Sequence, residues 1–222
     1  VLTGLMATSA AVGLVGWAAG QTNTTIWYLA PVGRGDVDAT DWDNAAPIRR
    51  ISQIAAQAPA ETEFRIGFAA ADLPWEWSGQ QIRLVSLGTK MAPVRVVFGS
   101  LDASNMFKQA NNMDDLVTLY MDGDDVDADG RPDVGGQPYA VFGPDTNHVQ
   151  VSGPSFYRAG GDGFFNIDAG GLVRDFAFSD IFARRAGRVI EAEQTTAIDG
   201  LRVERCSAVG LIRGFARFFE LH

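Results

Sequence analysis

The alternation of apolar and polar residues divides much of the chain into short strand-like segments separated by glycine and proline. Residues 24–33, TTIWYLAPVG, are rich in β-branched and aromatic side chains and end at proline and glycine, which is typical of a strand. The segments EFRIGFAA, QIRLVSLG and VRVVFGS, at 63–70, 81–88 and 94–100, alternate or run apolar and stop at small residues. The pattern predicts a mostly-β protein.

One stretch between these strands has helical periodicity. The segment DWDNAAPIRRISQIAAQAP offers a helix start at Asp43 or Asn44, with Pro47 in the first turn and Pro59 after the end. Its apolar side chains fall on one stripe of such a helix: Ile48, Ile51, Ile54, Ala55 and Ala58. One amphipathic helix is therefore expected near the N-terminal end of the strand region.

The last third of the chain repeats. Apolar strands opened by glycine begin at Gly163 (GFFNID), Gly187 (GRVIEA) and Gly210 (GLIRGF), so the separations are 24 and 23 residues. Another strand-like run precedes each of them, in the order HVQVSGPSF, LVRDFAFSDI and IDGLRVERC. Two strands per turn at a near-constant interval indicate a solenoid with a continuous core. An antiparallel sandwich with evenly spaced hairpins is the alternative that this spacing leaves open.

The order of these elements resembles a known family. The strand IWYLAPVGRGDVDATDW, the helix APIRRISQIAAQA and glycine-punctuated coils with VSGPSF and FAFSDI are similar to the right-handed parallel β-helix proteins of the pectin-lyase-like superfamily. The resemblance covers roughly residues 24–222 and implies an all-β solenoid whose amphipathic helix caps its N-terminal end. It places an N-terminal strand and capping helix at 21–60 and the coils of the solenoid at 61–222. It also implies that the coils continue beyond the C-terminus.

Residues 1–20 have the character of an export signal. They carry no charge, the first charged side chain is Arg34, and the run closes on the small residues Ala18, Ala19 and Gly20, as a signal peptidase requires. Dilution by glycine, alanine, serine and threonine favours a signal peptide or leader over a retained membrane anchor. The expected location is secreted, periplasmic or cell-surface.

Charge and residue usage narrow the range of partners and chemistries. The 18 basic and 27 acidic side chains of the 222 residues give a net charge of -9, which argues against nucleic acid and, after leader removal, against a membrane surface. Cys206 is the only cysteine, so no intrachain disulfide is possible. His148 and His222 are the only histidines, which disfavours a multi-histidine zinc site and leaves His148 as the sole basis for a Ser–His–Asp triad.

An acidic loop, DGDDVDADGRPD at 122–133, has the spacing of a calcium site. Its predicted ligands occupy positions 1, 3, 5, 7 and 9 of a calcium loop, with the position 7 ligand a backbone carbonyl: Asp125, Asp127, Asp129, Arg131 and Asp133. Gly130 stands where such a loop turns sharply, whereas Gly136 replaces the bidentate glutamate of an EF-hand. A structural calcium ion is the prediction, and a solvated acidic insertion between two strands is the alternative.

Outward side chains on neighbouring coils supply the candidate chemistry. Strands of adjacent coils lie about 4.8 Å apart, so side chains at equivalent positions come close together. The candidates for catalysis are Asp175, Asp180, Arg184, Glu204 and Arg205. Paired carboxylates would suit inverting glycoside hydrolysis, and an arginine base beside a cation-binding carboxylate would suit β-elimination from a uronate. Any half-exposed strand also shows such alternation of charged and aromatic residues.

These observations favour an exported, carbohydrate-active β-helix protein, a polysaccharide lyase or glycoside hydrolase. A non-catalytic β-helix that serves as an adhesin, surface or fibre component would need the same fold and the same calcium loop. A β-sandwich binding module is the third hypothesis, and in it the strands would not form a solenoid. Parallel pairing between the predicted strands distinguishes the first two hypotheses from the third.

Overall fold

The computed structural model describes residues 24–58, 61–72, 75–76, 82–85, 87–89, 92–109, 118–120, 140–157, 165–168, 170–184, 188–192, 197–209 and 217–221. Within them, the backbone alone is described for 75–76, 118–120, 155–157, 184, 188 and 217–221. The predicted leader at 1–20 and the predicted calcium loop lie outside these residues. Over the described part of the chain, no helix combines the length and the apolar character needed to span a membrane.

The strands of the described residues form three sheets, here named A, B and C. Sheet A contains, in spatial order, β16 (Ala197–Glu204), β13 (Leu172–Ser179), β10 (Val149–Ser152), β6 (Val94–Leu101), β3 (Thr62–Ala69), β1 (Thr25–Ala30) and β2 (Ala46–Pro47), and β7 (Phe107–Gln109) pairs with β6. Sheet B contains β17 (Ser207–Val209), β14 (Phe182–Arg184), β11 (Ser155–Tyr157), β8 (Thr118–Tyr120) and β4 (Trp75–Glu76). Sheet C contains β18 (Arg217–Leu221), β15 (Arg188–Ala192), β12 (Phe165–Ile167), β9 (Ala140–Phe142) and β5 (Ile82–Leu84).

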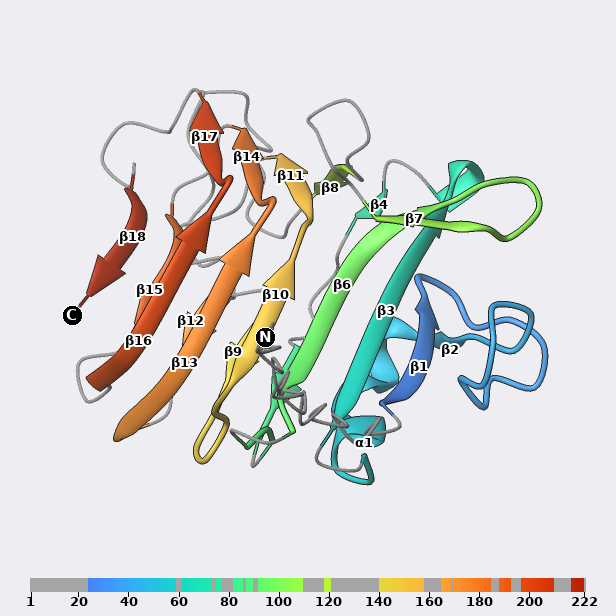
Figure 1. Ribbon diagram of the computed structural model, residues 1–222. Coiled ribbons are helices and arrows are strands. Elements are labelled where there is room, and N and C mark those ends of the chain that lie inside the picture. Colours follow the sequence, from blue (N-terminus) through green and yellow to red (C-terminus); the bar gives the residue numbers. More distant parts are fainter. Residues whose placement is uncertain are drawn as a thin grey trace, which may run out of the picture.

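From β3 onward the chain visits the three sheets in turn, so each coil contributes a strand to each sheet. Sheet A strands lie side by side as long arrows in Figure 1, and their neighbours pair in parallel. Only β6 and β7 pair antiparallel among the named strands. The mostly parallel all-β arrangement is compatible with a solenoid, and an antiparallel sandwich does not describe it. The prediction of two strands per turn is wrong, because β14 and β17 add a third.

The predicted helix exists but is shorter and begins later than expected. Residues 46–47 pair with β1 as strand β2, followed by a single 3-10 turn, η1 (Ile48–Arg50), and α1 (Ile51–Ala55). A second 3-10 turn, η2 (Ala70–Asp72), follows β3. The side chains of Ile51, Ile54 and Ala55 are buried in the core. Pairing of Ala46 and Pro47 with the end of β1 takes these residues out of the helix, so tertiary contact overrides the local start signal.

Helix α1 covers the free edge of sheet C. It packs against β5, the last strand of that sheet, and the Ser52 hydroxyl oxygen accepts a hydrogen bond from the Arg83 backbone N–H at 2.8 Å. An uncovered edge strand exposes unpaired N–H and C=O groups to other chains. The helix thus satisfies one of these groups and covers apolar residues at this end of the sheets.

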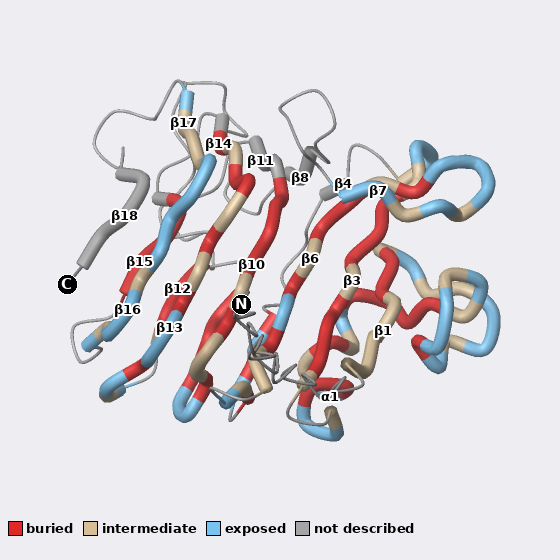
Figure 2. The backbone as a smooth tube through the Cα atoms, in the orientation of Figure 1, coloured by how far each residue is buried: buried red, intermediate tan, exposed pale blue. Residues whose placement is uncertain are grey.

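The core lies between the sheets and is built largely from phenylalanine and branched aliphatic side chains. One inward row of sheet A stacks in register from β3 to β13, namely Phe64, Val96, Val151 and Phe178. The ring of Phe178 meets that of Phe165 in sheet C at 5.5 Å, and Phe142 meets Phe176 at 5.5 Å. Figure 2 shows buried stretches along strands of sheet A such as β3, β6 and β10. Contact between rings from two sheets ties the coils into one core.

Residues with a left-handed backbone conformation, that is with positive φ, turn the chain from sheet A toward sheet B. Gly153, Asp180 and Arg205 hold equivalent positions in three consecutive coils, one after the end of β10, β13 and β16, with φ of 69°, 56° and 50°. The Gly153 N–H donates to the Ser179 carbonyl at 2.9 Å, and the Asp180 N–H donates to the Glu204 carbonyl at 3.2 Å. We call these three residues the A–B corner.

A second row of residues with left-handed backbone conformation lies earlier along the chain, just before β10 and within β13 and β16. His148, Asp175 and Gly200 stand two residues before Gln150, Ala177 and Arg202, which are partners in the parallel register. Their φ values are 52°, 53° and 83°. We call His148, Asp175 and Gly200 the entry row of sheet A. Only glycine adopts this conformation without steric cost, so the two other residues of the row are strained.

Candidate functional site

A groove of about 750 Å³ lies on the outer face of sheet A. Its floor comes from outward residues of successive strands, which alternate with the inward core row. One row in parallel register contains Glu63, Arg95, Gln150, Ala177 and Arg202. The next outward row contains Arg65, Val97, Ser152, Ser179 and Glu204. The groove therefore crosses the coils and collects residues that are far apart in the sequence.

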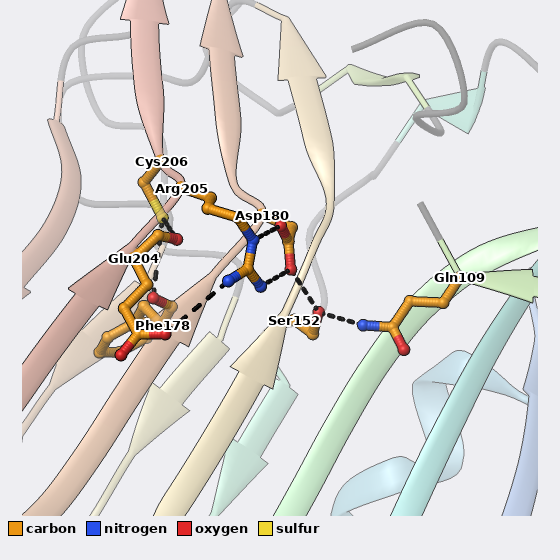
Figure 3. A network of polar contacts seen from close by, with 7 residues as sticks. All are labelled: Gln109, Ser152, Phe178, Asp180, Glu204, Arg205 and Cys206. Carbon is orange, nitrogen blue, oxygen red and sulfur yellow. Dashed lines mark hydrogen bonds and ion pairs between the residues drawn. The ribbon is translucent and has the colours of Figure 1, made fainter. Parts of the chain in front are cut away.

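The A–B corner supplies an ion pair at one side of the groove, between a buried carboxylate and an exposed guanidinium. Arg205 donates from Nε to Asp180 Oδ1 at 2.6 Å and from Nη2 to Oδ2 at 2.7 Å, a bidentate geometry seen in Figure 3. The Ser152 hydroxyl donates to Asp180 Oδ2 at 3.4 Å and itself accepts from Gln109 Nε2. Asp180 is 5% exposed, so its carboxylate depends on these donors.

The ion pair further stabilises the protonated state of Arg205. Its hydrogen bonds to Asp180 and the negative charge of that carboxylate raise the pKa of the Arg205 guanidinium above its ordinary value. Glu204 lies 3.8 Å from the same guanidinium and acts in the same direction. A general base must give up its proton at working pH. The pairing therefore makes Arg205 a poor base, although β-elimination would require one.

Aromatic side chains form a wall at the other end of the groove, near β3. Arg65 donates from Nε to Glu63, and its guanidinium lies 5.8 Å from the Phe107 ring and 6.0 Å from the Tyr28 ring. Trp42 stacks on Phe107 with ring centroids 5.2 Å apart. Cation–π contacts of this kind hold a guanidinium in place. Arg65 is therefore part of the wall, and the hairpin strand β7 is fixed over the sheet.

Two arginines of the groove floor, Arg95 and Arg202, are less engaged in ion pairs with carboxylates than Arg65 and Arg205 are. Arg95 lies 3.6 Å from Glu63 and its side chain is 47% exposed. Arg202 is exposed, and within the described part of the chain it has no carboxylate within ion-pair distance. Arginine recognises carboxylates and other planar anions through its fork of donors. These two side chains are available to a ligand, whereas Arg65 and Arg205 are already engaged.

The structure brings three of the five predicted catalytic residues together. Asp180, Glu204 and Arg205 all line the groove. Asp175 lies in the entry row and does not join them, because His148 Nδ1 holds its Oδ2 at 2.8 Å. Arg184 belongs to β14 in sheet B, and its side chain is not among those described.

The predicted calcium ligands cannot be placed in the same way. All five, Asp125, Asp127, Asp129, Arg131 and Asp133, lie outside the described residues. Elsewhere, among the residues that the structure does describe, no three His, Cys, Asp or Glu side chains are grouped closely enough to hold a metal ion. Calcium binding therefore stays a prediction from the loop sequence.

Several groove residues were not predicted from the sequence. Glu63, Arg65, Arg95, Gln109 and Ser152 come from segments separated by up to 89 residues, and none carries a recognisable motif. Their common feature is outward position in the parallel register. The alternation within EFRIG and VRVVFG was the only available signal, since it places charged residues opposite the apolar face.

Comparisons with protein-family models, with curated proteins and with solved structures each found no match for this chain. The residues and register described above thus provide the basis for inferring a function. What they offer is a groove that crosses several coils, with charged side chains on β3, β6 and β16 and two available arginines.

Proposed function

We propose that this chain is an exported, carbohydrate-active protein with a right-handed parallel β-helix fold, which binds an acidic polysaccharide in the groove of sheet A and cleaves it as a lyase or hydrolase. The three parallel sheets visited in turn support the fold. The uncharged leader supports export to the periplasm, the cell surface or the medium. The predicted calcium ion would serve the structure of its own loop.

The single observation that carries the proposal is the register of the groove. Equivalent outward positions repeat at each strand, about 4.8 Å apart, from β3 to β16. A ligand that lies across the strands meets one side chain from each of the two outward rows at every step, and most of these side chains are polar. Repeating chains such as polysaccharides have the matching regularity, whereas a compact metabolite would use only one step.

The charge of the groove favours an acidic chain. Four arginines, Arg65, Arg95, Arg202 and Arg205, face three carboxylates, Glu63, Asp180 and Glu204, so the lining carries one net positive charge. The whole chain carries a net charge of -9. A locally positive groove on an acidic protein concentrates negatively charged ligands there.

One observation favours a second, non-catalytic function. Asp180 and Arg205 satisfy each other, so neither is free to transfer a proton. An adhesin, surface or fibre component would need only the binding groove and the coils. Binding is common to both functions, and cleavage separates them.

Binding and cleavage are tested together with a panel of acidic and neutral polysaccharides. Affinity electrophoresis measures binding, new reducing ends report cleavage, and the ultraviolet absorbance of an unsaturated uronate distinguishes elimination from hydrolysis. Arg202→Ala is expected to weaken binding of acidic chains about tenfold, because a hydrogen bond to a charged group is lost. Arg49→Ala is the control, since it removes the same charge from an exposed residue away from the groove. Equal retention of neutral and acidic chains, or none of either, would contradict the proposal.

A further inference from the structure

A histidine–aspartate pair borders the groove and is not explained by the fold. His148 Nδ1 lies 2.8 Å from Asp175 Oδ2, and both residues belong to the entry row of sheet A. Each stands two residues before a groove residue on its own strand, Gln150 and Ala177 respectively. Two residues of a strand span about 7 Å. The pair therefore lies beside the groove, although neither of its residues is among those that line it.

The backbone does not require these side chains. The third residue of the entry row is Gly200, with φ of 83°, and glycine adopts this conformation without the strain that any side chain adds. A Cβ at Gly200 would lie 2.7 Å from Asp175 Oδ1, so the absence of a side chain at Gly200 lets the Asp175 carboxylate lie against the backbone of the next coil. Strained non-glycine residues persist where their side chains have a use. His148 and Asp175 are such residues.

The contact between them orients the imidazole. When Nδ1–H donates to the Asp175 carboxylate, the lone pair of the neutral ring is carried by Nε2. The same arrangement prepares the histidine of hydrolytic triads to accept a proton. The side chain of Asp175 is 59% exposed and that of His148 is 15% exposed, so the carboxylate is hydrated while the ring is held.

We propose that His148 is the general base of the groove, with Asp175 as its positioning residue. The proposal rests on the proposed function, in its lyase form. The competing base, Arg205, is held by Asp180. Arg202, exposed and two residues after Gly200, lies in register with Ala177 and reaches the same part of the groove.

The reaction follows from these roles. Arg202 pairs with the carboxylate of a bound uronate, which makes the neighbouring C–H bond more acidic. His148 Nε2 takes that proton, and the electrons of the C–H bond form a carbon–carbon double bond. The adjacent C–O bond to the leaving sugar breaks, and its oxygen takes a proton from water. The imidazolium then returns its proton to solvent, so no oxidant or other reactant is consumed.

The orientation of the imidazole is tested without substrate. In mildly alkaline buffer, ¹⁵N NMR of the ring nitrogens is expected to show the proton of His148 on Nδ1, and Asp175→Asn is expected to change that signal. His222→Gln leaves His148 as the single histidine and assigns its resonances. A proton on Nε2, or a signal that Asp175→Asn does not alter, would overturn the assignment of roles.

The role of the base is tested by chemical rescue. His148→Gly suits the left-handed backbone, as Gly200 does, and is expected to lower kcat at least about 100-fold with little change in KM. Added imidazole should restore part of the rate. His148→Asn, which also tolerates this conformation, should show the same loss, and His222→Gln should keep the full rate.

The outcomes separate this inference from the proposed function. If the wild-type chain cleaves acidic polysaccharide and His148→Gly cleaves it equally well, the base is another group and the proposed function stands. Binding without cleavage by the wild-type chain overturns the base but leaves the polysaccharide groove. If the wild-type chain neither binds nor cleaves any acidic polysaccharide, both proposals fall.

Discussion

Arg205 holds Asp180 across two consecutive coils by two hydrogen bonds, of 2.6 and 2.7 Å, between its guanidinium and both carboxylate oxygens. Both residues have a left-handed backbone conformation, and they occupy equivalent positions of the A–B corner. The same guanidinium lies 3.8 Å from Glu204, so it also compensates the next carboxylate in the groove. The pair therefore links the turn between sheets A and B to the electrostatics of the groove.

Arg205→Gln is expected to destabilise the fold more than Arg202→Gln. The first change leaves the buried carboxylate of Asp180 without its charged partner, whereas the second removes an exposed guanidinium. Urea unfolding midpoints, followed by circular dichroism, measure the difference. Because the hydrogen bonds and charge of Asp180 raise the pKa of Arg205 above its ordinary value, the guanidinium stays protonated in mildly alkaline buffer, and the difference between the variants should persist there. Equal midpoints for the two variants would show that water replaces the guanidinium without cost.

Two glycines with positive φ separate backbone strain from steric collision. Gly170, with φ of 63°, has no atom within 4 Å of a built Cβ, so Gly170→Ala should cost only the left-handed penalty of about 1–2 kcal/mol. Gly88, with φ of 80°, has the Asn147 carbonyl oxygen in direct collision with a Cβ. Gly88→Ala should therefore cost clearly more. Free energies of unfolding from urea titrations test the order, and a reversed order would contradict these turn geometries.

Much of the strand pattern was predictable from the sequence, but the third strand of each coil was not. Segments such as β3 and β6 alternate over eight residues, long enough for a period to be recognised. Strands β14 and β17 have three residues each, too few to show one. The helix start was misplaced for a different reason. Asn44 donates its N–H to Asp41 and its Oδ1 accepts from Asp36, so it stabilises a loop and does not cap a helix.

The candidate site was predictable only where the coil length is constant. Asp180 and Arg205 are 25 residues apart, as are Ala177 and Arg202 in the register, and this interval is close to the glycine spacing of 24 and 23 residues. The pairing of Arg95 with Gln150 spans 55 residues, so nothing local indicates it. From the sequence alone Asp175 belongs with the groove carboxylates, because the sequence shows neither its left-handed backbone conformation nor its contact with His148.

Phe178→Ala is expected to cost about 3–5 kcal/mol of unfolding free energy. The Phe178 ring is fully buried and contacts Phe165 at 5.5 Å and Phe142 at 6.3 Å, so its loss opens a cavity between sheets A and C. Val209→Ala, at a side chain 57% exposed, is the matched control and should change stability little. Urea denaturation measures both, and similar small losses would mean that the two sheets do not share one core.

Cys206 is expected to react slowly in the folded protein. Burial raises the pKa of its thiol above the ordinary value of 9.0, so less thiolate is present at mildly alkaline pH than in an unfolded chain. Its Sγ also lies 3.2 Å from the Glu204 carbonyl, to which the protonated thiol can donate. Its contribution to stability is present below pH 9.0 and falls as pH rises through the raised pKa. A chromogenic disulfide reagent should label Cys206 rapidly only after denaturation, and equal rates in both states would contradict its burial.

Calcium is expected to raise the melting temperature if the loop at 122–133 binds it as its spacing predicts. Because an ion that binds only the folded state stabilises it by mass action, calcium at 100 times its Kd should contribute about 2.7 kcal/mol. Thermal scans in chelator and in excess calcium measure the shift, and calorimetric titration gives Kd. Asp127→Asn weakens a hard anionic ligand and should reduce the shift, while Asp36→Asn, at an exposed residue outside the loop, should preserve it. Superimposable scans with and without calcium would mean that the loop is a solvated acidic insertion. That result would not bear on the polysaccharide groove, because the described lining of the groove contains none of the loop residues.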